Sequence, residues 1–75
     1  MPKLHRISGQ EAIRKLEKLG FQQLRQRGSH VVLKKKTPER DIGCVVPLHK
    51  ELARGTMKGI IDLAEIDMEE FLKNI

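Results

Sequence analysis

The chain has 75 residues, with 15 Lys or Arg against 10 Asp or Glu, which gives a formal net charge of +5 at pH 7. This length permits one domain, residues 1–75, with a modest hydrophobic core, and excludes a second. With two Phe and no Trp or Tyr, the composition argues against aromatic platforms for single-stranded nucleic acid, whereas the charge favours a polyanionic partner.

The single cysteine, Cys44, cannot form an intramolecular disulfide, which is typical of a reducing compartment. It lies in an apolar run, residues 42–46, where a small buried side chain is expected rather than a nucleophile. The first residues lack an apolar signal region, and no stretch approaches the length of a membrane span. We therefore expect a cytoplasmic protein.

A first helix is predicted after Ser8, because Ser8 and Glu11 have the spacing of a capping box. Apolar residues then recur at helical spacing: Ala12, Ile13, Leu16 and Leu19. The intervening charged residues are expected to face solvent: Arg14, Lys15, Glu17 and Lys18. Gly20 is suited to be the left-handed residue that ends the helix.

A β-hairpin is predicted over residues 25–36, with Gly28 and Ser29 as a type II′ turn, because Gly accepts the positive φ at its first position. This loop fixes the cross-strand pairs: Arg27 with His30, Arg25 with Val32, and Leu24 with Leu33. One face is then expected to meet the core: Leu24, Val31 and Leu33. The opposite face gathers His30, Val32 and four cations: Arg25, Arg27, Lys34 and Lys36. Phe21 does not share the parity of Leu24, which requires either a bulge or a strand that begins after Phe21.

The second half of the chain predicts a turn at residues 37–41, a strand at 42–46 closed by Pro47, and an irregular connection at 48–55. A second helix is expected from about Thr56, with a core-facing stripe: Met57, Ile60, Ile61 and Ala64. Gly59 weakens this helix, and its small size would allow close approach of the sheet or a ligand. After Asp67, a short last helix is expected to turn three apolar residues inward: Phe71, Leu72 and Ile75.

The predicted order is α-β-β-β-α followed by a short helix. Consecutive strands joined by short turns form an antiparallel sheet, and helices packed on one face leave the other face open. The expected fold class is therefore α+β, with a three-stranded antiparallel sheet.

His30 is the most suggestive chemical group, because the hairpin places it among cations on the open face. Histidine can move protons near neutral pH, and RNA supplies its own nucleophile in the 2′-hydroxyl. Lys and Arg can stabilise the phosphoryl anion that forms during cleavage. The alternative interpretation is an ordinary surface histidine.

Other candidate sites are weaker. Arg54 and Lys58 flank the start of the second helix, where free backbone donors favour an anion, but ordinary surface charge is the alternative. His5, His30 and His49 lie too far apart to predict a metal site, so neither a metal nor another cofactor is expected. Adjacent strand residues point to opposite faces, so Ser29 and His30 do not suggest a catalytic triad.

Short segments along nearly the whole chain occur in a characteristic order: Ile7-Ser8-Gly9, Leu19-Gly20-Phe21, Arg27-Gly28-Ser29-His30, Val46-Pro47-Leu48-His49, and Gly55-Thr56 before Ile60 and Ile61. This ordered set resembles the HicA family of toxins, small ribonucleases that act on messenger RNA and are held inactive by a HicB antitoxin.

The resemblance implies a fold like the double-stranded RNA-binding domain, with His30 of the Gly28-Ser29-His30 segment as the catalytic residue. His49 matches the histidine of a Pro-x-His pattern and would either order the following loop or contribute to the site. His5 stands where proline is more usual, and no function is attached to it. The implied partners are a messenger RNA and a HicB-like antitoxin that covers the active site.

These considerations predict a metal-independent endoribonuclease, a hydrolase in which His30 acts as general acid or base. The residues expected to grip phosphates are Arg25, Arg27, Lys34, Lys36 and Lys58. A non-catalytic RNA-binding module of the same fold is the main alternative, and a domain that binds an acidic protein is a third.

Overall fold

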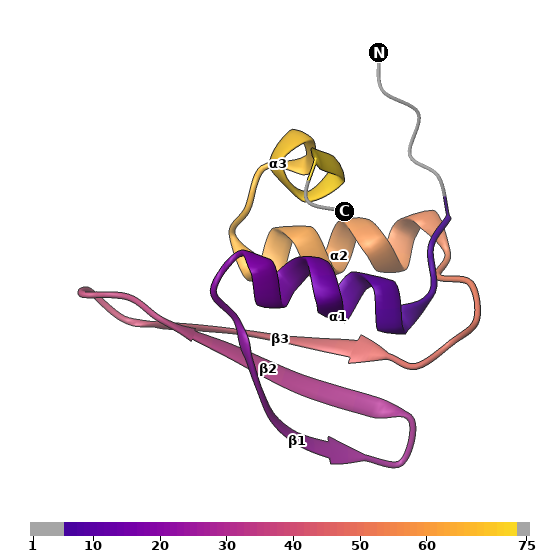
Figure 1. Ribbon diagram of the computed structural model, residues 1–75, viewed down its shortest axis with the longest axis horizontal. Coiled ribbons are helices and arrows are strands. Elements are labelled where there is room, and N and C mark those ends of the chain that lie inside the picture. The colour runs from indigo at the N-terminus through magenta and orange to yellow at the C-terminus, as the bar shows by residue number, and fades with distance from the viewer. Residues whose placement is uncertain (1–5, 74–75) are drawn as a thin grey trace.

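The computed structural model describes residues 6–73. The elements follow in the order α1 (Gly9–Lys18), β1 (Gln22–Arg27), β2 (His30–Lys36), β3 (Asp41–Pro47), α2 (Arg54–Ala64) and α3 (Met68–Lys73). The three strands form one antiparallel sheet in the order β1-β2-β3. Both longer helices lie on one side of this sheet, and α3 lies beyond α2 (Figure 1). The predicted α+β fold and its α-β-β-β-α order are confirmed, and this order is that of the double-stranded RNA-binding domain.

The first helix begins and ends as its sequence predicts. Ser8 accepts a hydrogen bond from the backbone N–H of Glu11, and the Glu11 side chain completes the capping box. Gly20 follows with φ +102°, a conformation that favours glycine. Lys15 differs from the prediction because it is buried, and its Nζ donates hydrogen bonds to the carbonyl oxygens of Phe71 at 3.2 Å and Leu72 at 3.5 Å.

The hairpin turns at Gly28 and Ser29, and Gly28 alone of the two has positive φ, at +56°, as a type II′ turn requires. Leu24 is not opposite Leu33, so that part of the predicted register is wrong. Gln23 pairs with Leu33, and the register shifts between Gln23 and Arg25. The strand therefore both begins after Phe21 and carries an irregularity at Leu24, which leaves the Leu24 side chain 56% exposed.

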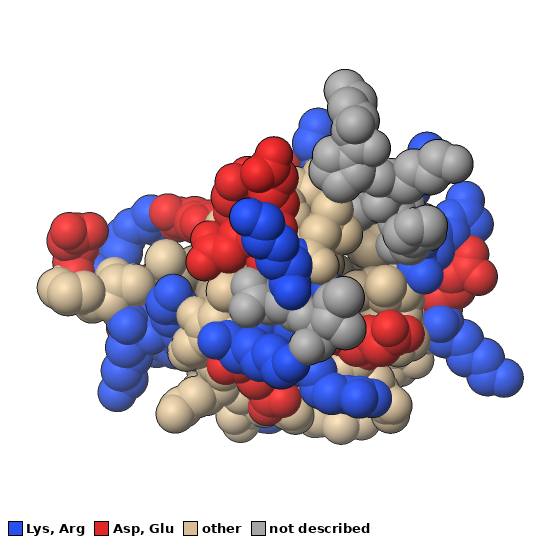
Figure 2. Space-filling model, turned by 45° about the horizontal axis from the view of Figure 1, so that its top comes forward, with Lys and Arg blue, Asp and Glu red and all other residues tan. Residues whose placement is uncertain are grey.

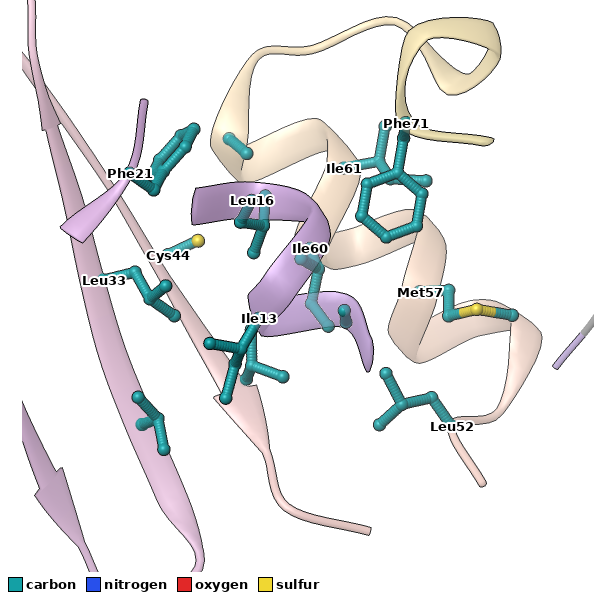
Figure 3. Packing of buried hydrophobic residues seen from close by; sticks show 14 residues of the cluster. Ile13, Leu16, Phe21, Leu33, Cys44, Leu52, Met57, Ile60, Ile61 and Phe71 are labelled. Carbon is teal, nitrogen blue, oxygen red and sulfur yellow. The ribbon is translucent and has the colours of Figure 1, made fainter. Parts of the chain in front are cut away.

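The core lies between the sheet and the helices (Figure 3). Its sheet side consists of Val31, Leu33, Cys44 and Val46, and its helix side includes the predicted stripe Met57, Ile60, Ile61 and Ala64. Phe71 brings α3 onto this core next to Ile61 (Figure 3). The inward position predicted for Ile75 falls outside the described residues, as does His5.

The second helix begins at Arg54, two residues earlier than expected, after Ala53, which provides no side-chain cap. A Cβ atom on Gly59 would meet nothing from the sheet within 4 Å, so the sheet does not approach closely there, and the approach of a ligand stays a prediction. The close approach is at Gly9, where a Cβ would lie 2.1 Å from the carbonyl oxygen of Pro47. Within residues 6–73, no helix has the length and apolar character needed to cross a membrane.

Candidate functional site

The uncovered side of the sheet, called here the open face, consists of rows of residues paired across the strands. The strand register gives these rows as Arg27–His30–Pro47, Arg25–Val32–Val45, Gln22–Lys34–Gly43 and Lys36–Asp41. Directly opposed side chains share one face of a sheet. The open face therefore brings together His30 and the four hairpin cations, as the sequence predicts.

His30 is the first residue of β2 and is exposed. It lies directly opposite Arg27 across the tight turn, which places the two Cβ atoms about 4.5–5.5 Å apart. The turn also fixes the connection after β3, because the carbonyl oxygen of Ser29 accepts a hydrogen bond of 2.6 Å from the backbone N–H of Leu48. His30 is thus an exposed residue next to a turn that is hydrogen-bonded to the loop after β3.

The positive charge of the open face is unevenly compensated. Lys34 Nζ lies 2.8 Å from Asp41 Oδ2, and this hydrogen bond from Lys34 lowers the pKa of the Asp41 carboxyl. Arg25 and Arg27 form no ion pair within the described part of the chain. The two cations closest in register to His30 are therefore available for an anion.

Arg54 and Lys58 are not part of the open face. Both are exposed on α2, in the helix layer on the other side of the sheet. Figure 2 shows acidic and basic side chains interspersed over the helix side of the molecule. Lys58 is thus placed apart from the other predicted phosphate-binding residues.

His49 lies in the connection between β3 and α2 and is exposed. Its carbonyl oxygen accepts a hydrogen bond of 2.9 Å from the backbone N–H of Gly9 at the start of α1. Its side chain borders a hollow of about 260 Å³ together with Ser8, Gln10, Leu48 and Lys50. The backbone of His49 therefore helps to hold the loop against α1.

A hollow of about 300 Å³ does not include His30. It lies on the helix side, between α1 and the hairpin, and is lined by Gln10, Ile13, Arg14, Glu17, Gln23, Gln26, Val31 and Leu48. We assign the site to the open face instead, because that face holds His30 and the unpaired arginines.

The open face also contains residues that the sequence does not assign to it, among them Leu24, Asp41 and Val45. Leu24 lines a shallow hollow with Gln22, Lys34 and Lys36, and Val45 is 43% exposed beside Val32. Once the pairing of β2 with β3 is known, the alternation of β3 identifies Asp41 and Val45. For Leu24, the parity mismatch with Phe21 indicates an irregularity of the strand but does not locate it, and the structure places it between Gln23 and Arg25.

Cys44 points into the core and does not belong to the site. Burial raises the pKa of its thiol to about 11, so the thiol is protonated at neutral pH. Within residues 6–73, no group of three or more His, Cys, Asp or Glu residues is placed to hold a metal ion.

The fold and the open face together define a small α+β protein with an exposed histidine in a basic field. The model of one family, described as the HicA toxin of bacterial toxin-antitoxin, matches residues 9–66, which include the hairpin, the loop after β3 and α2. The chain belongs to the HicA toxin family. It is therefore a toxin of the toxin-antitoxin type, and α3 lies outside the matched region. A search of curated proteins found no match.

Proposed function

We propose that this toxin is a metal-independent endoribonuclease that cleaves messenger RNA in the cytoplasm, with His30 as its general acid or base. The observation that carries the proposal is the pairing of an exposed His30 with Arg27, next to Arg25, on the sheet face opposite the described helices; neither arginine forms an ion pair among residues 6–73. Membership of a toxin family supports it, since loss of messenger RNA would stop growth.

The chemistry needs one proton acceptor and a cationic environment. The neutral imidazole of His30 takes the proton from a 2′-hydroxyl, whose oxygen then forms a bond to the adjacent phosphorus. The bond from phosphorus to the 5′-oxygen breaks, and this oxygen takes a proton from water. The products are a 2′,3′-cyclic phosphate and a free 5′-hydroxyl.

The arginines supply the electrostatic part of the reaction. Arg25 and Arg27 stabilise the charge that develops on the phosphoryl oxygens, where fixed donors are most effective. Lys34 and Lys36 contribute less, because both lie beside Asp41. Gly28 and Ser29 act indirectly, since their turn positions His30.

A toxin of this kind requires a partner that silences it. We propose that a HicB-like antitoxin covers the open face and thereby blocks access to His30. Co-expression with the neighbouring gene should recover a complex in which His30 is protected from diethyl pyrocarbonate. Recovery of the free protein alone would contradict this partner.

The deciding experiment is cleavage of a long messenger RNA in EDTA by wild-type protein, His30→Ala and His49→Ala, with circular dichroism to verify folding. We expect the His30→Ala variant to lose at least about a hundredfold in rate, a typical contribution of acid–base catalysis. His49→Ala should retain cleavage.

Several outcomes would contradict the proposal. Equal cleavage by wild type and His30→Ala would place the activity elsewhere, and a 5′-phosphate at the cut would exclude attack by the 2′-hydroxyl. If no variant cleaves but all bind RNA with steep salt dependence, the protein is a non-catalytic RNA-binding module.

A further inference from the structure

The middle of the open face is apolar. Val32 on β2 and Val45 on β3 are directly paired, and they lie in the same row as Arg25 on β1. Val45 is 43% exposed and Val32 is partly exposed. Of the three large apolar side chains that are exposed within residues 6–73, two lie at or beside this face: Leu24 and Val45.

A glycine lies beside this pair on the open face. Gly43 is the next residue of β3 on the same face and is exposed. A Cβ at Gly43 would meet only the carbonyl oxygen of Leu33, at the ordinary distance of 3.7 Å, so packing does not require glycine here. Glycine within a strand often marks a place where a ligand approaches closely.

Two arginines lie on one side of the Val32–Val45 pair. Arg25 and Arg27 lie on β1 and are unpaired, whereas Lys34 is bound to Asp41. A single-stranded nucleic acid would therefore place its phosphates along β1, and its bases would extend over β2 and β3. Each nucleotide of RNA offers this combination of an anion and a flat base.

We propose that Val32 and Val45 form an apolar platform for a nucleobase of the RNA, whose flanking phosphates bind Arg25 and Arg27. This inference rests on the proposed function, because it takes RNA as the ligand of the open face. The platform would position the nucleotide next to His30, two residues before Val32 on the same face of β2.

The test uses an uncleavable probe, a short 2′-O-methyl RNA, and an abasic oligonucleotide with the same number of phosphates. In wild-type protein with labelled valine methyl groups, the RNA should shift the Val45 methyl signals upfield through the ring current of the base. The abasic probe should leave these signals nearly unchanged while still shifting the Arg25 and Arg27 signals.

A variant gives the matching affinity measurement. Val45→Thr preserves shape but replaces an exposed methyl by a hydroxyl, and it should weaken binding of the RNA probe roughly threefold to tenfold. Binding of the abasic probe should be unchanged. Leu63→Thr is the control, because Leu63 is 60% exposed on α2, in the helix layer.

The outcomes distinguish the proposed nucleobase platform from the proposed ribonuclease activity. Equal binding of both probes, or equal effects of Val45→Thr and Leu63→Thr, would overturn the platform even if cleavage depends on His30. Loss of antitoxin binding without loss of RNA binding would assign the valine pair to a protein interface instead. Wild-type protein that binds neither probe would overturn the platform and the proposed function together.

Discussion

Lys34 and Asp41 are joined across the open face, with Nζ of the lysine 2.8 Å from Oδ2 of the aspartate. Asp41 also lies directly opposite Lys36. The Asp41 carboxylate therefore lowers the net positive charge at the Lys34 and Lys36 end of β2. The uncompensated positive charge of the open face lies at the other end, around Arg25 and Arg27. If the proposed RNA ligand binds this face, this asymmetry favours its phosphates near His30.

Removing the Asp41 charge should strengthen RNA binding. In Asp41→Asn, Lys34 becomes free to contact a phosphate, so the dependence of log affinity on log salt should steepen by about 0.7 per added contact. Affinity for a 2′-O-methyl RNA, measured at several salt concentrations, checks this. Glu69→Gln on α3 removes the same charge away from the sheet, and an equal gain there would show that net charge alone is responsible.

The ion pair between Lys34 and Asp41 predicts a small pH-dependent contribution to the free energy of unfolding. The pKa of Asp41 is lowered by its hydrogen bond from Lys34, so the folded state favours the carboxylate. Its contribution is complete above the ordinary pKa of an aspartate and is lost as the pH falls through the lowered value. The difference in urea midpoint between wild type and Asp41→Asn should therefore shrink from neutral pH to about pH 3. An unchanged difference would contradict the ion pair.

Much of the fold follows from local sequence signals. The Ser8–Glu11 capping box predicts the start of α1, and the Gly28-Ser29 turn sets Arg27 opposite His30. Period-two alternation within Val31–Leu33 then assigns the buried and open faces. Each of these signals arises between residues close together in the chain, where geometry leaves few alternatives.

The errors concern contacts that the local sequence pattern does not determine. Lys15 was expected in solvent because it is charged, but its acceptors belong to residues 56 and 57 positions further along the chain. Leu24 was expected in the core, but the register shift places Gln23 opposite Leu33 instead. The Gln23 side chain then donates a hydrogen bond to Glu17 on α1, an interaction that alternation alone does not reveal.

In the candidate site, too, the residues set by local sequence signals are predicted and the others are not. The hairpin cluster around His30 was predicted because all of its members lie within one tight turn and its strands. Lys58 is predicted to bind phosphate because it is a cation near the start of the second helix, and α2 carries it to the other layer. Asp41 and Val45 required the pairing of β2 with β3, whose register depends on the length of the intervening turn.

Lys15 should hold α3 on the domain. Burial lowers the pKa of its ammonium group, so the charge is costly in the folded state, and the carbonyl oxygens of Phe71 and Leu72 offset that cost. Lys15→Met preserves the apolar stem but leaves both acceptors unpaired, and it should lower the free energy of unfolding by about 1–3 kcal/mol. Urea unfolding measures the loss, and amide exchange should increase first in α3. The neighbouring Arg14→Met is the control, and an equal effect there would refute this role.

Cys44 should be unreactive in the folded protein. With a pKa of about 11, only about one thiol in ten thousand is ionised at neutral pH, and the side chain is buried. Labelling by iodoacetamide should therefore be limited by unfolding and should become rapid in urea. Cys44→Ala should bind RNA like the wild type, though with reduced stability. Fast labelling under native conditions would show that the core opens at β3.

Gly9 should be the least replaceable glycine in the chain. A Cβ there would lie 2.1 Å from the carbonyl oxygen of Pro47, and the backbone N–H of Gly9 donates to His49, so the clash would separate α1 from the loop after β3. Gly9→Ala should destabilise the protein by about 1–3 kcal/mol, as overpacking commonly does. Gly59→Ala is the matched control, because its Cβ meets open space within α2, and it should stabilise the protein by about 1 kcal/mol. If urea unfolding shows the two substitutions to have effects of the same sign, the close contact between Gly9 and Pro47 does not determine the packing of α1. The loop after β3 would then be held by its other hydrogen bonds, from Leu48 N–H to the Ser29 carbonyl and from Leu52 N–H to the Ile7 carbonyl.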